Sequence, residues 1–139
     1  KKIMSNKEQT LSIIKPDAVE RNLAEKIKLI FSENNLTIKE TKKLHISKDE
    51  AAEFYKVHQA KPFYDQLCSY LSSGPIEVII LEGENAVLKN RELMGATDPK
   101  NAADGTIRKL YGVSIDKNSV HGSDSVENAR KEIDFFFKN

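Results

Sequence analysis

The chain has 139 residues, which is enough for one domain with a buried core and too few for two domains of ordinary size. With 39% hydrophobic and 31% charged residues, and no run near the ~18 apolar residues of a membrane span, the composition excludes a disordered or membrane-spanning chain. The 22 basic and 21 acidic residues leave a net charge of +1, so we expect no membrane partner and no nucleic acid as primary partner.

The single cysteine, Cys68, cannot form an internal disulfide and has no second cysteine for a zinc motif. No apolar secretion signal opens the sequence, so we expect a cytoplasmic protein. The first residue is lysine, and we expect Met4 to be the natural start, with Lys1 to Ile3 added ahead of it. We expect a single domain over residues 1–139.

The first third of the chain predicts a strand, a helix and a second strand. The apolar run from Thr10 to Ile14 stops at Pro16, which cannot continue a central ladder, so the strand ends there. Alternation of apolar and polar residues from Leu36 to Ile46 indicates a strand with one buried face. Between the strands, apolar residues at helical spacing predict a helix that ends near Asn34: Leu23, Ile27, Ile30 and Phe31.

The middle of the chain predicts two helices joined by an elbow. Ser47 and Glu50 form a capping box that opens a helix reaching His58. A second helix begins with Pro62 at its first position and ends before Gly74. Tyr55 and Phe63 flank this break. Such aromatic residues usually pack in a core, but here a ring could also meet a planar ligand.

A buried central strand follows from Ile76 to Leu81, and a helix from Ala86 to Met94 ends at Gly95. The loop from Ala96 to Gly105 is long for a compact domain, which is typical of a binding element. Arg91 precedes this loop, Thr97 lies inside it and Arg108 follows it. The two arginines either make surface ion pairs or bind phosphate oxygens with their planar guanidinium groups.

A short helix or turn from Asp104 to Leu110 leads to a strand-like stretch from Val113 to Val120. His121 then lies before a helix, with Gly122 allowing a sharp turn and Ser123 or Asp124 as N-cap, and a helix N-terminus attracts anions. An isolated histidine in this setting is more often structural, so both interpretations stay open.

The last helix carries an apolar stripe from Val126 to Phe137, and Asp124 with Glu127 fits a second capping box. At about 100° per residue, Glu132 turns toward the buried side, where it could hold the imidazole of His121 in one tautomer or make a flanking salt bridge. The element order β-α-β-α(α)-β-α-β-α predicts an α+β fold, a ferredoxin-like sandwich. No glycine-rich phosphate motif of the P-loop or Rossmann type occurs.

Five segments in order resemble the nucleoside diphosphate kinase family: Lys15-Pro16-Asp17-Ala18-Val19, Tyr55 to Phe63, Met94-Gly95-Ala96-Thr97, Gly105-Thr106-Ile107-Arg108 and Asn118 to Ser125. The resemblance implies a four-stranded antiparallel sheet with an excursion loop near residues 91–108. It also implies a ping-pong transfer of the γ-phosphoryl group from a nucleoside triphosphate, usually ATP, to a nucleoside diphosphate. His121 would be the nucleophile, carrying a pros-phosphohistidine, with Glu132 orienting its ring and Ser123 bonded near that carboxylate.

The same resemblance implies a nucleotide site. Phe63 would stack on the base beside Leu67, while Asn118 and Lys15 would reach the sugar hydroxyls. The residues around the phosphates would be Lys15, Tyr55, Arg91, Thr97 and Arg108. Mg²⁺ would be held mainly by the nucleotide phosphates rather than by a protein metal site. The alternative is a nucleic-acid-binding or regulatory module on the same fold.

The family also assembles from dimers, so we expect a homo-oligomer, either a tetramer or a hexamer. Longer members use a C-terminal extension in assembly, whereas this sequence stops at Asn139, and the choice stays open. Asn22 and Glu25 stand where many members have glycine, and Ala103 and Asp104 where proline is frequent. These departures touch a helix entry and loop packing and leave the residues of the predicted chemistry intact.

Overall fold

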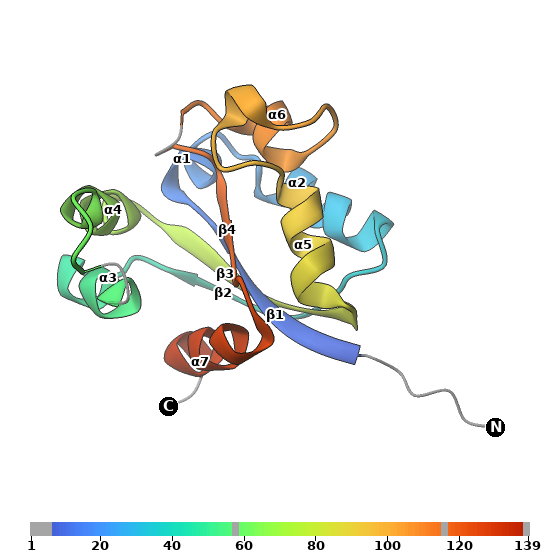
Figure 1. Ribbon diagram of the computed structural model, residues 1–139, viewed down its shortest axis with the longest axis horizontal. Coiled ribbons are helices and arrows are strands. Elements are labelled where there is room, and N and C mark those ends of the chain that lie inside the picture. Colours follow the sequence, from blue (N-terminus) through green and yellow to red (C-terminus); the bar gives the residue numbers. More distant parts are fainter. Residues whose placement is uncertain (1–6, 57–58, 115–116, 138–139) are drawn as a thin grey trace.

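The structure is a computed structural model that describes residues 7–56, 59–114 and 117–137. Figure 1 shows its central sheet with helices on both faces. The strands are β1 (Lys7–Ile14), β2 (Thr37–Leu44), β3 (Ile76–Glu84) and β4 (Val120–Gly122). The helices are α1 (Pro16–Glu20), α2 (Ala24–Glu33), α3 (Lys48–Phe54), α4 (Tyr64–Leu71), α5 (Ala86–Met94), the 3₁₀ helix η2 (Pro99–Asn101), α6 (Ile107–Tyr111) and α7 (Val126–Phe137).

The four strands form one antiparallel sheet in the order β2-β3-β1-β4. This confirms the predicted α+β, ferredoxin-like fold with a four-stranded antiparallel sheet. None of the described helices combines the length and apolar character needed to cross a membrane.

Successive side chains of β1 point to opposite faces of the sheet, and each face has its own core. Leu11 and Ile13 pack with residues of α3, α4 and α7, whereas Ile14 packs with Ile27 and Phe31 of α2 and with residues of α5. In Figure 1, α2 and α5 lie on one side of the sheet, and α3, α4 and α7 lie on the other. The short strand β4 therefore runs between two packed layers.

Two predicted helix ends are confirmed. Ser47 caps α3 as a capping box: its hydroxyl accepts from the Glu50 amide at 3.0 Å, and the Glu50 carboxylate accepts from the Ser47 amide at 2.9 Å. Gly95 ends α5 with a φ of 86°, in the left-handed region that favours glycine.

Among the other predicted boundaries, the end of the first strand is confirmed and the start of the helix after Pro62 is wrong. Pro16 does end the first strand, but it also begins helix α1, because proline suits the first helical position. Helix α4 begins at Tyr64 rather than Pro62, with Phe63 as its N-cap residue. The end of α3 predicted at His58, and the predicted start at Met4 after Lys1 to Ile3, lie outside the described residues.

The strand predicted over Val113 to Val120 is also wrong, since β4 covers only Val120–Gly122. Val113 is 63% exposed, and Ser119 has a φ of 77°, which no strand residue adopts. The second capping box is displaced as well. The amide of Asn128 donates to Ser125 Oγ at 3.0 Å, so Ser125 rather than Asp124 caps the N-terminus of α7.

Gly122 has a different role from the predicted sharp turn. It lies within β4, opposite Ser12 of β1. A Cβ atom there would lie 2.4 Å from Asn90 Nδ2 and 2.7 Å from Met94 Cε, both on α5. A larger residue at this position would displace these two side chains, so glycine lets α5 pack closely against the strand.

Candidate active site

His121 lies in β4, paired with Ile13 of β1, and its side chain is 21% exposed. Its Nε2 lies 3.1 Å from Oε1 of Glu132 on α7, and Ser123 Oγ donates to the same oxygen at 2.7 Å. An ionised carboxylate can only accept, so the hydrogen of a neutral imidazole is on Nε2. The other ring nitrogen, Nδ1, then keeps its lone pair, which a nucleophile requires.

The imidazole of His121 also contacts two aromatic rings from the end of α3. The Phe54 ring centre lies 5.3 Å away at 73°, and the Tyr55 ring centre lies 6.4 Å away at 84°, both as edge contacts. Between α3 and α7, a cavity of about 320 Å³ is lined by His121, Phe54 and Glu132, among others. The histidine is thus held on one side by a carboxylate and on another by rings, with open space beside it.

Arg108, on α6, lies with its guanidinium group between the excursion loop and β4. Its Nη1 donates to the carbonyl of Gly95 at 3.0 Å, and its Nη2 donates to the carbonyl of Val120 at 2.9 Å. Burial, and then the nearby cation of Arg91, lower the pKa of Arg108 to about 10. The group is a cation at neutral pH, one residue away from the backbone of His121.

Lys15 and Asn118 form a second group at the other end of β4. Lys15 Nζ donates to Asn118 Oδ1 at 2.9 Å, and Asn118 Nδ2 donates to the carbonyl of Thr97 at 3.1 Å. Lys15 is 5% exposed and Asn118 is 2% exposed. Three candidate residues, from the end of β1, the excursion loop and the approach to β4, therefore meet.

The remaining candidates lie around these two groups. Tyr55 is buried, and burial raises the pKa of its hydroxyl, so it stays protonated at neutral pH. Phe63 is 42% exposed at the start of α4, and Leu67 packs partly against the core of that face. Arg91 is exposed near the end of α5. The structure thus has two groups of candidate residues along β4: His121 with Glu132 and Ser123, and Lys15 with Thr97 and Asn118. Phe63 and Leu67 lie on the helical elbow.

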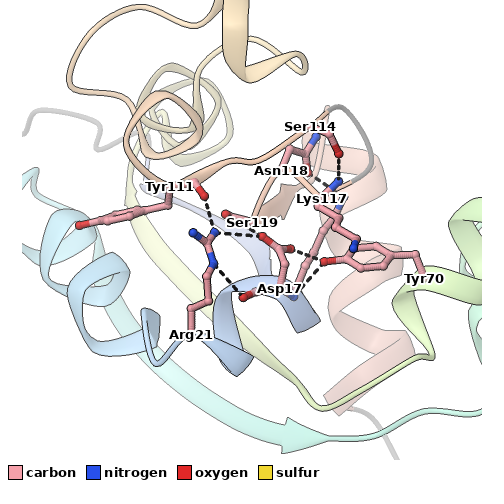
Figure 2. Close-up of polar contacts among 9 residues, drawn as sticks. Asp17, Arg21, Tyr70, Tyr111, Ser114, Lys117, Asn118 and Ser119 are labelled. Atoms are coloured by element: carbon pink, nitrogen blue, oxygen red, sulfur yellow. Dashed lines mark hydrogen bonds and ion pairs between the residues drawn. The ribbon is translucent and has the colours of Figure 1, made fainter.

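Sequence reasoning did not single out two features beside this site. Phe54 contacts His121, but in the sequence it is an ordinary apolar residue of a helix. A polar network centred on Asp17, shown in Figure 2, adjoins Lys15 and Asn118. Within the described part of the chain, no three histidine, cysteine, aspartate or glutamate side chains are grouped to hold a metal ion.

The model of the nucleoside diphosphate kinase family matches residues 8–139. The chain belongs to the nucleoside diphosphate kinase family. It is 60% identical over 130 residues to the nucleoside diphosphate kinase of a Nitratiruptor species, covering 94% of this chain and 95% of that protein. It is 59% identical to the nucleoside diphosphate kinase of Campylobacter fetus subsp. fetus, with the same coverage.

Solved structures of nucleoside diphosphate kinases have the same fold. The Aquifex aeolicus enzyme in an orthorhombic crystal form superposes with a TM-score of 0.93 at 40% identity, covering 96% of each chain. The Halobacterium salinarum enzyme, solved in complex with CDP, gives a TM-score of 0.90 at 39% identity, covering 95% of this chain and 88% of that one. The family resemblance drawn from the sequence motifs is confirmed.

Proposed function

We propose that this nucleoside diphosphate kinase moves the γ-phosphoryl group of a nucleoside triphosphate, usually ATP, to a nucleoside diphosphate through a phosphohistidine on His121. The observation that carries this proposal is the hydrogen bond between Nε2 and Glu132, which leaves Nδ1 as the nucleophile. Attack of Nδ1 on the γ-phosphorus breaks the bond to the β-phosphate oxygen, and the nucleoside diphosphate leaves. The terminal oxygen of a second diphosphate then attacks, breaks the N–P bond and restores the imidazole.

Glu132 and Ser123 act on the charge that the reaction creates. When Nδ1 bonds to phosphorus, the imidazole becomes cationic while Nε2 keeps its hydrogen. The carboxylate of Glu132, 3.1 Å from Nε2, stabilises that charge, and the Ser123 hydroxyl fixes the carboxylate at 2.7 Å. A neutral imidazole needs no separate base, so catalysis rests on positioning and charge stabilisation.

The proposal includes the nucleotide contacts that the family resemblance implies. Phe63, exposed on the elbow, stacks on the base beside Leu67, and stacking on a π-face tolerates different bases. Asn118 and Lys15 bind the sugar hydroxyls. The phosphate oxygens are bound by Lys15, Tyr55, Arg91, Thr97 and Arg108. That the halophilic relative was solved with CDP supports a nucleotide in this fold.

Mg²⁺ would be held mainly by the phosphate oxygens of the bound nucleotide, where it would supply charge neutralisation. The described residues fit this arrangement, since they offer cations and hydroxyls to the phosphates rather than a carboxylate cluster. The proposal includes a homo-oligomer of dimers, a tetramer or a hexamer, as the family resemblance implies. It also includes a cytoplasmic location, supported by the buried free thiol of Cys68.

Labelling with γ-³²P-ATP tests the phosphohistidine. We expect a phosphoprotein that is labile in acid and stable in alkali, and GDP should discharge it. His121→Ala should abolish the label. His45→Ala is the matched control, because His45 is exposed and bonds through Nε2 to the Ser72 carbonyl, and it should keep the label. Label retained in His121→Ala would overturn the mechanism.

A further inference from the structure

The backbone makes an unusual turn between the Lys15–Asn118 pair and His121. Ser119, between Asn118 and Val120, has a φ of 77°, and the Val120 amide donates to the Asn118 carbonyl at 2.9 Å. A bond from residue i+2 to residue i with positive φ in the middle is a γ-turn of the rare, strained form. A positive φ is sterically unfavourable for serine, so the surrounding contacts must stabilise this conformation.

Ser119 is fully buried and is held from both ends. Its Oγ donates to Asp17 Oδ2 at 3.0 Å, and its carbonyl accepts from the Lys15 amide at 2.8 Å. The motif Lys15-Pro16-Asp17 therefore holds the turn by two hydrogen bonds, one from the Lys15 backbone amide and one to the Asp17 carboxylate on α1. The proline between the two contacts fixes their relative placement.

Asp17 is 8% exposed and is the centre of a network drawn in Figure 2. The Tyr70 hydroxyl, from α4, donates to Asp17 Oδ1, and Arg21 Nη2 lies 3.4 Å from Oδ2. The same arginine donates to the Tyr111 carbonyl at the end of α6. A buried carboxylate with several donors is held firmly, because each oxygen has a partner.

Tyr70 can serve as a constant donor to this carboxylate. Burial, together with the hydrogen bond to Asp17, raises the pKa of the Tyr70 hydroxyl far above neutral. The Asp17 amide also donates to the Tyr70 oxygen at 2.8 Å, so the two residues are bonded in both directions. Asp17 thus links α1, α4 and the end of α6 to the turn.

The turn determines how the two halves of the site face each other. On one side, Asn118 accepts from Lys15 Nζ. On the other side, the Val120 carbonyl accepts from Arg108, and His121 follows directly. If the turn relaxed, Asn118 would move relative to His121, because only Ser119 and Val120 separate them.

We propose that Asp17 and Ser119 are positioning residues that hold the γ-turn and so set the Lys15–Asn118 pair at the correct place relative to His121. Neither side chain needs to touch the nucleotide, since Ser119 is fully buried and its hydroxyl donates to Asp17. This inference rests on the proposed function for the identity of the ligand. It predicts weaker recognition of the sugar hydroxyl of the nucleotide rather than a general loss of enzyme activity.

The test compares a 2′-deoxynucleoside diphosphate with its 2′,3′-dideoxy counterpart as acceptor. The ratio of their kcat/KM values measures the contact with the 3′-hydroxyl, and it does not depend on how much of the protein is folded. Ser119→Ala keeps the Cβ atom and removes only the hydroxyl that donates to Asp17, and Asp17→Asn keeps the shape and removes the charge. In both variants we expect the preference for the 3′-hydroxyl to fall several-fold from its wild-type value.

Ser114→Ala is the matched control, because Ser114 lies in the same connection and its Oγ accepts only from the Lys117 amide at 3.1 Å among the bonds described. It should keep the wild-type ratio. An unchanged ratio in Ser119→Ala and Asp17→Asn, or a wild type without preference for the 3′-hydroxyl, would overturn the inference. A failure of the proposed function would give a wild-type protein that γ-³²P-ATP does not label. A failure of this inference would leave the labelling of His121 intact and the ratio unchanged in the two variants.

Discussion

The orientation of one imidazole decides the chemistry of this site. Nε2 of His121 is hydrogen-bonded to Glu132, and the centres of the His121 and Phe54 rings lie 5.3 Å apart in an edge contact. A free histidine populates both tautomers, whereas here the carboxylate selects one and leaves the lone pair of Nδ1 as the nucleophile. The sequence predicted this carboxylate, because rotation along the last helix turned Glu132 inward. It could not predict Phe54, since nothing in an apolar residue of a helix marks it as a neighbour of His121.

Glu132→Gln should slow phosphorylation of His121 by roughly 10- to 100-fold, because a charged hydrogen-bond acceptor contributes about 1.5–3 kcal/mol. The glutamine carbonyl can still accept from Nε2, so the ring should stay in place while its developing charge loses its partner. Rapid-quench measurement of phosphohistidine formation in a single turnover checks this rate.

Glu127→Gln is the control for this prediction, because Glu127 lies on the same helix with a side chain 78% exposed. It should leave the rate unchanged. Equal rates for Glu132→Gln and the wild type would show that the carboxylate charge has no part in the chemical step.

At the scale of elements, the excursion loop depends on two glycines with the same positive φ. Gly95 and Gly105 both have a φ of 86°. A Cβ on Gly95 would lie 2.5 Å from Oγ1 of Thr106, the side chain that caps α6, whereas a Cβ on Gly105 would meet nothing within 4 Å. The carbonyl of Gly95 also accepts from Arg108.

Alanine at each position should therefore give different results. Both variants carry the strain of a positive φ, about 1–2 kcal/mol in urea unfolding. Gly95→Ala should in addition push Thr106 away and displace Arg108, so we expect kcat/KM to fall by at least about 10-fold, within the cost of losing one electrostatic donor. Gly105→Ala should keep kcat/KM. Steady-state assays on both variants check this, and equal losses would contradict the assigned role of Gly95.

The sequence predicts elements well where the signal is local. The Ser47 capping box and the glycine that ends α5 are short-range patterns, and both are present. It fails at the approach to β4, because the φ of 77° at Ser119 comes from contacts with Asp17 and Lys15 rather than from the residue type. Those contacts join segments that lie far apart in the sequence, and no local pattern shows them.

At the scale of the whole molecule, one sheet joins two cores. Ile13 and Ile14 are consecutive in β1, yet they belong to opposite cores, one with α3, α4 and α7 and one with α2 and α5. Neither core can lose its packing without loosening strands that the other core also uses. We therefore expect the two faces to unfold in one cooperative step, as small domains usually do.

The thiol of Cys68 can measure this cooperativity. It is 1% exposed in the core of α3, α4 and α7, and burial raises its pKa, so a thiol reagent should modify it only after the protein opens. Phe31→Ala removes a fully buried ring from the opposite core, at a cost of about 3–5 kcal/mol. If opening is global, the rate of Cys68 modification in native buffer at mildly alkaline pH should rise by roughly 100-fold or more. Leu29→Ala on the same helix, where Leu29 is 56% exposed, should change it little. A rate unaffected by Phe31→Ala would mean that the α4 face opens by itself, and the sheet would then not couple the two cores.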